Sequence, residues 1–273
     1  MYKRIISRLD IKNNTLVKGV NLEGLRVLGD PREFILSYYR ENIDEIFLQD
    51  VVASLYNRNQ LDKIIQDIVK NVFVTISVGG GLRNISDINK VLNLGADKIS
   101  INSAAIKNPS FLKNSVEVFG SSTITVNIET LKVNGKYMVL IESGREKTRY
   151  ELFDWIDRIQ QLGAGEAVVT SISYEGKGAG FDLELYKLLK KKLNIPLVAH
   201  GGAGSVEDII NLFKETDVDG VLISSLLHYS YIKKTSANNA GNTIFQKEFI
   251  KGKKISILDI KNELDKNNIS VRK

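Results

Sequence analysis

Two carboxylates stand at the ends of apolar, strand-like runs, and such a pair can perform acid–base chemistry. Asp10 follows the run Ile5–Leu9, and Glu129 follows Thr123–Ile128. One carboxylate in a sheltered cleft can act as general base while a second acts as general acid. Either could instead cap a helix or bind a lysine such as Lys18. We favour catalysis for Asp10, and both interpretations stay open for Glu129.

Glycine-rich turns form a second candidate site. The triplet Gly79–Gly81 follows a strand-like run and precedes a helical pattern, so its amides and the next helix N-terminus suit an anion. A glycine triplet alone fits a tight turn equally well, but each glycine turn here is followed by a polar pair at the end of the next strand-like run. The predicted phosphate cups are Gly80, Gly81, Asn102 and Ser103 in one, and Gly201, Gly202, Ser224 and Ser225 in the other.

Eight short β-rich runs alternate with amphipathic stretches, which predicts a single (β/α)8 TIM barrel rather than an open sheet. The helical stretches include Leu61–Val69, Ile85–Leu94, Leu152–Leu162 and Leu183–Leu193. The expected strands are Ile5–Leu9, Glu45–Gln49, Val72–Ser77, Lys98–Asn102, Thr123–Ile128, Ala167–Ser171, Pro196–Ala199 and Gly220–Ser224.

An internal repeat divides the chain into two similar half-barrels. The stretch Val78–Gly81 recurs at His200–Ala203, and Ala96–Ser103 recurs at Val218–Ser225, both 122 positions later. Two elements with one offset indicate four βα units in each half. Asp10 and Glu129 then face each other across the barrel mouth, with the two cups on opposite sides. The arrangement predicts a long ligand with a phosphate at each end.

Four charged residues stand where strands begin, at the opposite end of the barrel from the cups. Two acids and two bases there could neutralise one another around the barrel axis, because each would be costly to bury alone. They could form a structural ion network or a gate over an axial passage. The four are Arg4, Glu45, Lys98 and Glu166.

The domain prediction is one barrel over residues 1–273. It has a small hairpin after the fifth strand, an irregular, polar insertion at Ser230–Lys254 and a final helix at Ile255–Lys266. The formal net charge is +6, and the densest lysine run, Lys190–Lys192, fits a solvated helix face better than a nucleic-acid site.

The chain has no cysteine, no apolar run of about 20 residues and no visible signal peptide. We therefore expect a cytoplasmic protein that binds neither membrane nor nucleic acid and needs no metal ion or cofactor.

These features together resemble the cyclase subunit of imidazole glycerol phosphate synthase, the HisF family. The resemblance runs from Lys3 to about Tyr229 and resumes near the C-terminus. It is carried by Leu9–Lys12, Val17–Asn21, Leu25–Arg26, Gly29–Pro31, Val78–Arg83, Gly95–Ala105, Leu162–Ser171, Gly201–Gly204 and Ile269–Arg272.

The resemblance implies a lyase that takes ammonia from a HisH-type glutaminase, with which it forms a heterodimer. Its bisphosphorylated ribulosyl aminoimidazole substrate becomes imidazole glycerol phosphate and an aminoimidazole carboxamide ribotide in histidine biosynthesis. By residue, it implies catalysis by Asp10 and Glu129, substrate binding by Lys18 and Thr170, an ammonia gate of Arg4, Glu45, Lys98 and Glu166, and a glutaminase contact at Asp97. The missing cysteine nucleophile of glutamine hydrolysis would come from the partner.

The chain departs from the family pattern in the middle of the site. Glu129 stands in place of an aspartate, Arg8 of a cysteine and His200 of a serine, and Ser173–Lys177 replaces an acidic loop. This pattern leaves two alternatives to the cyclase. One is a paralogue that channels ammonia for acetamidino-sugar formation in surface polysaccharides. The other is a non-catalytic conduit that activates a glutaminase.

Overall fold

A closed barrel of eight parallel strands forms the centre of the computed structural model, which describes residues 2–53, 61–235 and 254–272. Each strand pairs with the next, and β12 pairs with β1 to close the cylinder. The (β/α)8 fold predicted from the sequence is thereby confirmed. The barrel strands are β1 (Arg4–Lys12), β4 (Glu45–Asp50), β5 (Thr75–Gly79), β6 (Lys98–Ile101), β7 (Ile124–Val133), β10 (Glu166–Ser171), β11 (Leu197–His200) and β12 (Gly220–Ile223).

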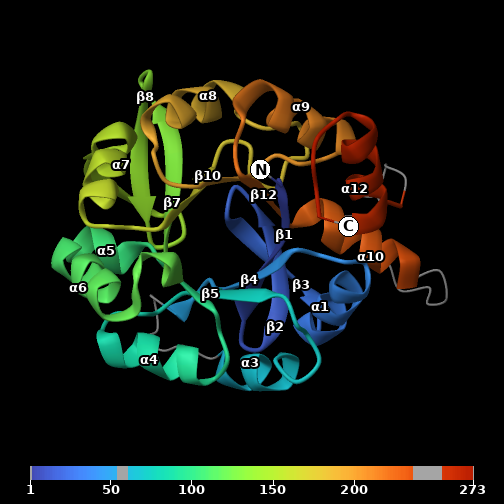
Figure 1. The fold of residues 1–273 in the computed structure, drawn as a ribbon, viewed down its shortest axis with the longest axis horizontal. Helices are drawn as coiled ribbons and strands as arrows, with labels where there is room; N and C mark the ends of the chain where they lie inside the picture. The colour runs from blue at the N-terminus through green and yellow to red at the C-terminus, as the bar shows by residue number, and fades with distance from the viewer. Residues whose placement is uncertain (1, 54–60, 236–253, 273) are drawn as a thin grey trace.

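Helices surround the strands and run around the ring broadly in chain order, as the colours of Figure 1 show, except that the last helix, α12, lies beside α9. The helix α12 brings the end of the chain beside its beginning, where Val271 forms a bridge with Lys3. The described helices are α1 (Pro31–Arg40), α3 (Asp62–Ile68), α4 (Ile85–Asn93), α5 (Ser103–Lys107), α6 (Pro109–Phe119), α7 (Leu152–Gln161), α8 (Leu183–Lys192), α9 (Val206–Thr216), α10 (Ser225–Thr235) and α12 (Ile257–Lys266), with a 3-10 turn at Ser121–Thr123.

Alternation along the strands sorts the side chains into two environments. Outward residues such as Ile5, Leu9 and Ile46 join the helices in the main core. Inward residues build layers along the barrel axis, as expected for this fold. One inward layer is apolar and consists of Ile6, Phe47, Val168, Val198 and Leu222. On β1, Arg4 and Arg8 share the face of Ile6 and lie on either side of it, so this layer separates two charged regions.

Each half of the barrel begins with a long strand that continues into an antiparallel excursion. After β1 come β2 (Thr15–Val20) and β3 (Glu23–Gly29), and after β7 come β8 (Lys136–Ile141) and β9 (Glu146–Glu151). The halves also share their helix caps: Asn84 caps α4 and Ser205 caps α9, each by accepting a hydrogen bond from a backbone N–H three residues on. These matches agree with the repeat read from the sequence.

The predicted insertion needs a correction at its start. Residues 230–235 belong to α10, because apolar side chains such as Ile232 pack on the core. Residues 236–253 lie outside the described part of the chain. The final helix begins at Ile257, where Ser256 forms a capping box with Asp259.

Candidate active site

Asp10 lies inside the barrel mouth, almost fully buried, between two cations. Its Oδ1 accepts a hydrogen bond from Arg8 Nε at 2.8 Å, and its Oδ2 is 4.0 Å from Lys18 Nζ. Burial pushes the pKa of Asp10 upward, but Arg8 and Lys18 outweigh it, so the pKa lies below its ordinary value. Asp10 is therefore a permanent carboxylate near neutral pH.

Glu129 reaches the same region from β7 and has the opposite character. Its Oε2 accepts a hydrogen bond from the backbone N–H of Gly144, in the turn between β8 and β9, at 2.9 Å. Burial raises the pKa of Glu129 to about 7, and the negative charge of Asp10 acts in the same direction. The pKa values of the two carboxylates are thus pushed apart: near neutral pH Asp10 is ionised, whereas Glu129 is about half protonated.

Lys18 connects the β2–β3 excursion to the loop that follows β10. It lies on β2 and forms a buried ion pair with Glu175, which follows β10. Glu175 also accepts a hydrogen bond from the backbone N–H of Leu22 at 3.2 Å. The four buried charges of Arg8, Lys18, Asp10 and Glu175 therefore cancel. Glu129 would add a fifth, uncompensated charge if it ionised, which fits its raised pKa.

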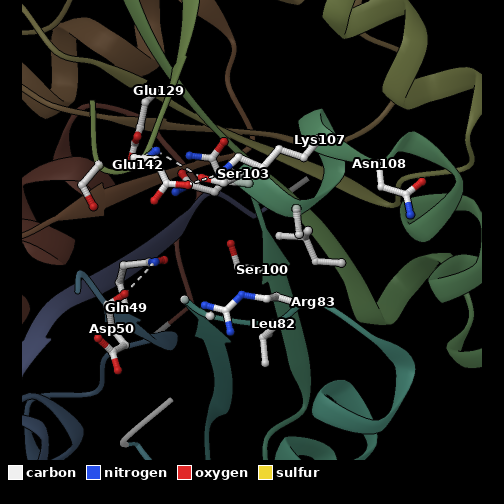
Figure 2. Close-up of a pocket in the computed structure, with 17 residues that line it drawn as sticks. Gln49, Asp50, Leu82, Arg83, Ser100, Ser103, Lys107, Asn108, Glu129 and Glu142 are labelled. Atoms are coloured by element: carbon white, nitrogen blue, oxygen red, sulfur yellow. Dashed lines mark hydrogen bonds and ion pairs between the residues drawn. The ribbon is translucent and has the colours of Figure 1, made fainter. Parts of the chain in front are cut away.

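The first predicted cup is a cavity of about 270 Å³ that all four predicted residues line. Gly80 has φ +99°, and a Cβ there would lie 2.3 Å from the carbonyl oxygen of Asp50, so only glycine fits. Figure 2 shows Lys107 reaching across this cavity toward Glu142, with Arg83 and Gln49 on the other side. The wall includes Glu129, which places the acid beside the cup.

The second cup is tighter, with a cavity of about 10 Å³, and all four predicted residues line it as well. Ser225 is the first residue of α10, so the amides of that helix end face the cup. At Gly202, φ is +122° and a Cβ would lie 1.9 Å from the carbonyl oxygen of Gly180. The loop after β10 contributes Glu175 and Gly176 to the wall.

Thr170 lies beside the second cup rather than in its wall. Its side chain is fully buried, and its Oγ1 is 3.0 Å from Nδ1 of His200. Nη1 of Arg8 approaches the same ring nitrogen at 3.4 Å. The structure thus joins Thr170 to Asp10 through His200 and Arg8.

The four charged residues at the strand starts form one ring at the far end of the barrel. Nη1 of Arg4 lies 3.2 Å from Oε2 of Glu45, and its Nη2 lies 2.5 Å from Oε2 of Glu166. Nζ of Lys98 lies 3.5 Å from Oε2 of Glu45 and 3.4 Å from Oε1 of Glu166. Each cation therefore bridges both acids.

Asp97 lies next to this ring on the exposed surface, where its Oδ2 accepts a hydrogen bond from the backbone N–H of Ile76 at 2.8 Å.

Several residues at the site were not predicted. Gln49 follows the apolar run of β4 as Asp10 follows that of β1, so the same signal, a polar residue directly after apolar ones, would have found it. Lys107 and Glu142 gave no such signal, because they reach the first cup from a helix and from the β8–β9 turn.

The fold and the site define a (β/α)8 barrel with a buried carboxylate pair and two glycine-turn cavities at one mouth. The profile of a family described as "Histidine biosynthesis protein" matches residues 4–233.

Relatives of the chain include three proteins named "Imidazole glycerol phosphate synthase subunit HisF". The Legionella pneumophila protein is 46% identical over 75% of this chain and 97% of its own length. The Natranaerobius thermophilus protein is 39% identical over 87% of this chain and 94% of its own length. The Hydrogenobaculum protein is 38% identical over 99% of this chain and 98% of its own length. The chain belongs to the HisF family of imidazole glycerol phosphate synthase cyclase subunits.

Proposed function

We propose that this chain catalyses the cyclase reaction of imidazole glycerol phosphate synthase in histidine biosynthesis. Its substrates would be ammonia and a ribulosyl aminoimidazole with two phosphates. The observation that carries the proposal is the carboxylate pair, in which Asp10 is ionised and Glu129 has a pKa of about 7, placed with the two cups at one barrel mouth.

The chemistry follows from these protonation states. When ammonia adds to the substrate, the new nitrogen must lose a proton, and the group that departs must gain one. Asp10 serves as the base, because Arg8 and Lys18 keep it ionised. Glu129 serves as the acid, because burial raises its pKa to about 7, so that about half of the molecules carry the proton at neutral pH. The phosphates in the two cups would hold the reacting middle of the substrate between them.

The ammonia would come from a HisH-type glutaminase bound at the strand starts, in a heterodimer. The ring of Arg4, Glu45, Lys98 and Glu166 covers the barrel axis there and would act as the gate. Asp97 lies exposed beside the ring and would contact the glutaminase.

No helix in the described part of the chain is long and apolar enough to cross a membrane.

The direct test is an ammonia-dependent cyclase assay on the purified chain, without a glutaminase. We expect both products to form, and we expect Asp10→Asn to lower kcat by roughly 100-fold or more. The exposed Asp157→Asn is a matched control that should leave the rate unchanged. If phosphate binds in both cups but no product forms, the cyclase proposal is wrong, and a conduit or an amidated-sugar pathway replaces it.

A further inference from the structure

His200 has two neighbours that fix which of its ring nitrogens carries the proton. Nδ1 lies 3.0 Å from Oγ1 of Thr170 and 3.4 Å from Nη1 of Arg8. A guanidinium has only donors, so Nδ1 must accept, and the hydroxyl of Thr170 donates to the same atom. The proton of the neutral ring therefore sits on Nε2.

The ring is also held in its neutral form. Burial lowers the pKa of His200 well below its ordinary value, and the cations of Arg8 and Lys18 lower it further. A second proton on this ring would face both cations. The ring consequently presents one N–H donor and no charge.

The second cup needs such a donor more than the first does. The first cup has Arg83 and Lys107 in its wall, whereas the wall given by the described residues of the second cup contains no lysine or arginine. Its one acid, Glu175, is already held by Lys18 and by the backbone N–H of Leu22. The donors left for an anion are backbone amides, the two serine hydroxyls and His200.

We propose that Nε2–H of His200 donates a hydrogen bond to a phosphate group in the second cup, and that Arg8 and Thr170 are positioning residues that hold the ring in this tautomer. The ligand class is a phosphate monoester. The inference rests on the proposed function only in taking the second cup to hold one of the substrate phosphates. Binding there does not require turnover.

Nitrogen NMR of the ¹⁵N-histidine-labelled chain tests the tautomer directly. The chain has two histidines, His200 and His228, so the spectrum of His200→Gln assigns both. We expect the proton on Nε2 of His200 and a shift of that resonance when inorganic phosphate is added. A proton on Nδ1, or no shift at saturating phosphate, would overturn the proposal.

Phosphate titration by calorimetry tests the contact. His200→Ala should weaken the second-cup site by roughly 10- to 100-fold, the loss expected for one hydrogen bond to a charged group. His200→Gln should retain part of the affinity, because its amide can donate. Asn102→Ala should weaken the first-cup site instead. Equal affinities for wild type and His200→Ala would refute the contact, whatever the cyclase assay shows.

Discussion

Glu129→Gln should make the protein more stable at alkaline pH, by an amount that the structure sets. Burial raises the pKa of Glu129 from 4.5 to about 7 in the folded chain. Between pH 4.5 and about pH 7, the folded state therefore holds a proton that the unfolded state has released. This contribution to stability is complete below about pH 4.5 and is lost as the pH rises to about 7. Each pH unit is worth about 1.4 kcal/mol, so the total loss is roughly 3 kcal/mol.

A glutamine cannot ionise, and its Oε1 can still accept the hydrogen bond from Gly144. Urea unfolding at pH 5, 6, 7 and 8 gives the free energy of unfolding of both proteins. The advantage of the variant over wild type should grow by roughly 2–3 kcal/mol from pH 5 to pH 8.

The depressed pKa values of His200 and His228 give an opposite slope, because a buried neutral ring costs stability as the pH falls. That slope is common to both proteins and cancels in the difference. Glu184→Gln, at an exposed carboxylate, is the matched control and should show no growing difference. A difference that stays constant across this range would refute the assignment of a raised pKa to Glu129.

Three further predictions follow from single contacts. At a fixed concentration of neutral ammonia, kcat should fall about tenfold per pH unit above pH 7 as Glu129 loses its proton; a level profile to pH 9 would contradict its role as acid. Gly202→Ala should abolish phosphate binding in the second cup by calorimetry, because its Cβ would lie 1.9 Å from a carbonyl oxygen; wild-type affinity would show that the loop can yield. Lys261→Met should lower the free energy of unfolding by about 3–5 kcal/mol, since it leaves a buried carboxylate unpaired. Lys266→Met, at an exposed pair, should change it by less than about 1 kcal/mol, and equal losses would refute the argument.

The barrel could be predicted because its strands are short apolar runs bounded by turns. The strand Glu166–Ser171 is buried along its whole length, as a parallel strand covered on both faces should be. The excursions were harder to predict. Strand β9 reads Glu146–Glu151 with one aromatic residue, and β3 is largely exposed, so neither shows an apolar alternation.

The site could be predicted at strand ends but not between them. Asp10 and the cup glycines carry their signal in local sequence. The Lys18–Glu175 pair joins residues 157 positions apart, so only the packing of the first excursion on the loop after β10 brings them together. The contact of Arg8 with Asp10 was easier to predict, because residues two apart on a strand share a face.

The buried, mutually neutralising charges around Asp10 determine how the reaction should respond to ionic strength. Arg8, Lys18, Asp10 and Glu175 are each at most 3% exposed, so mobile ions cannot enter between them. Salt screens charges that water separates, over about 8 Å at physiological ionic strength, but screens buried pairs much less. Substrate capture by the outer cations Arg83 and Lys107 should therefore weaken as salt is added. The electric field that acts on the bound substrate should stay the same, so ionic strength would change KM and leave kcat almost untouched.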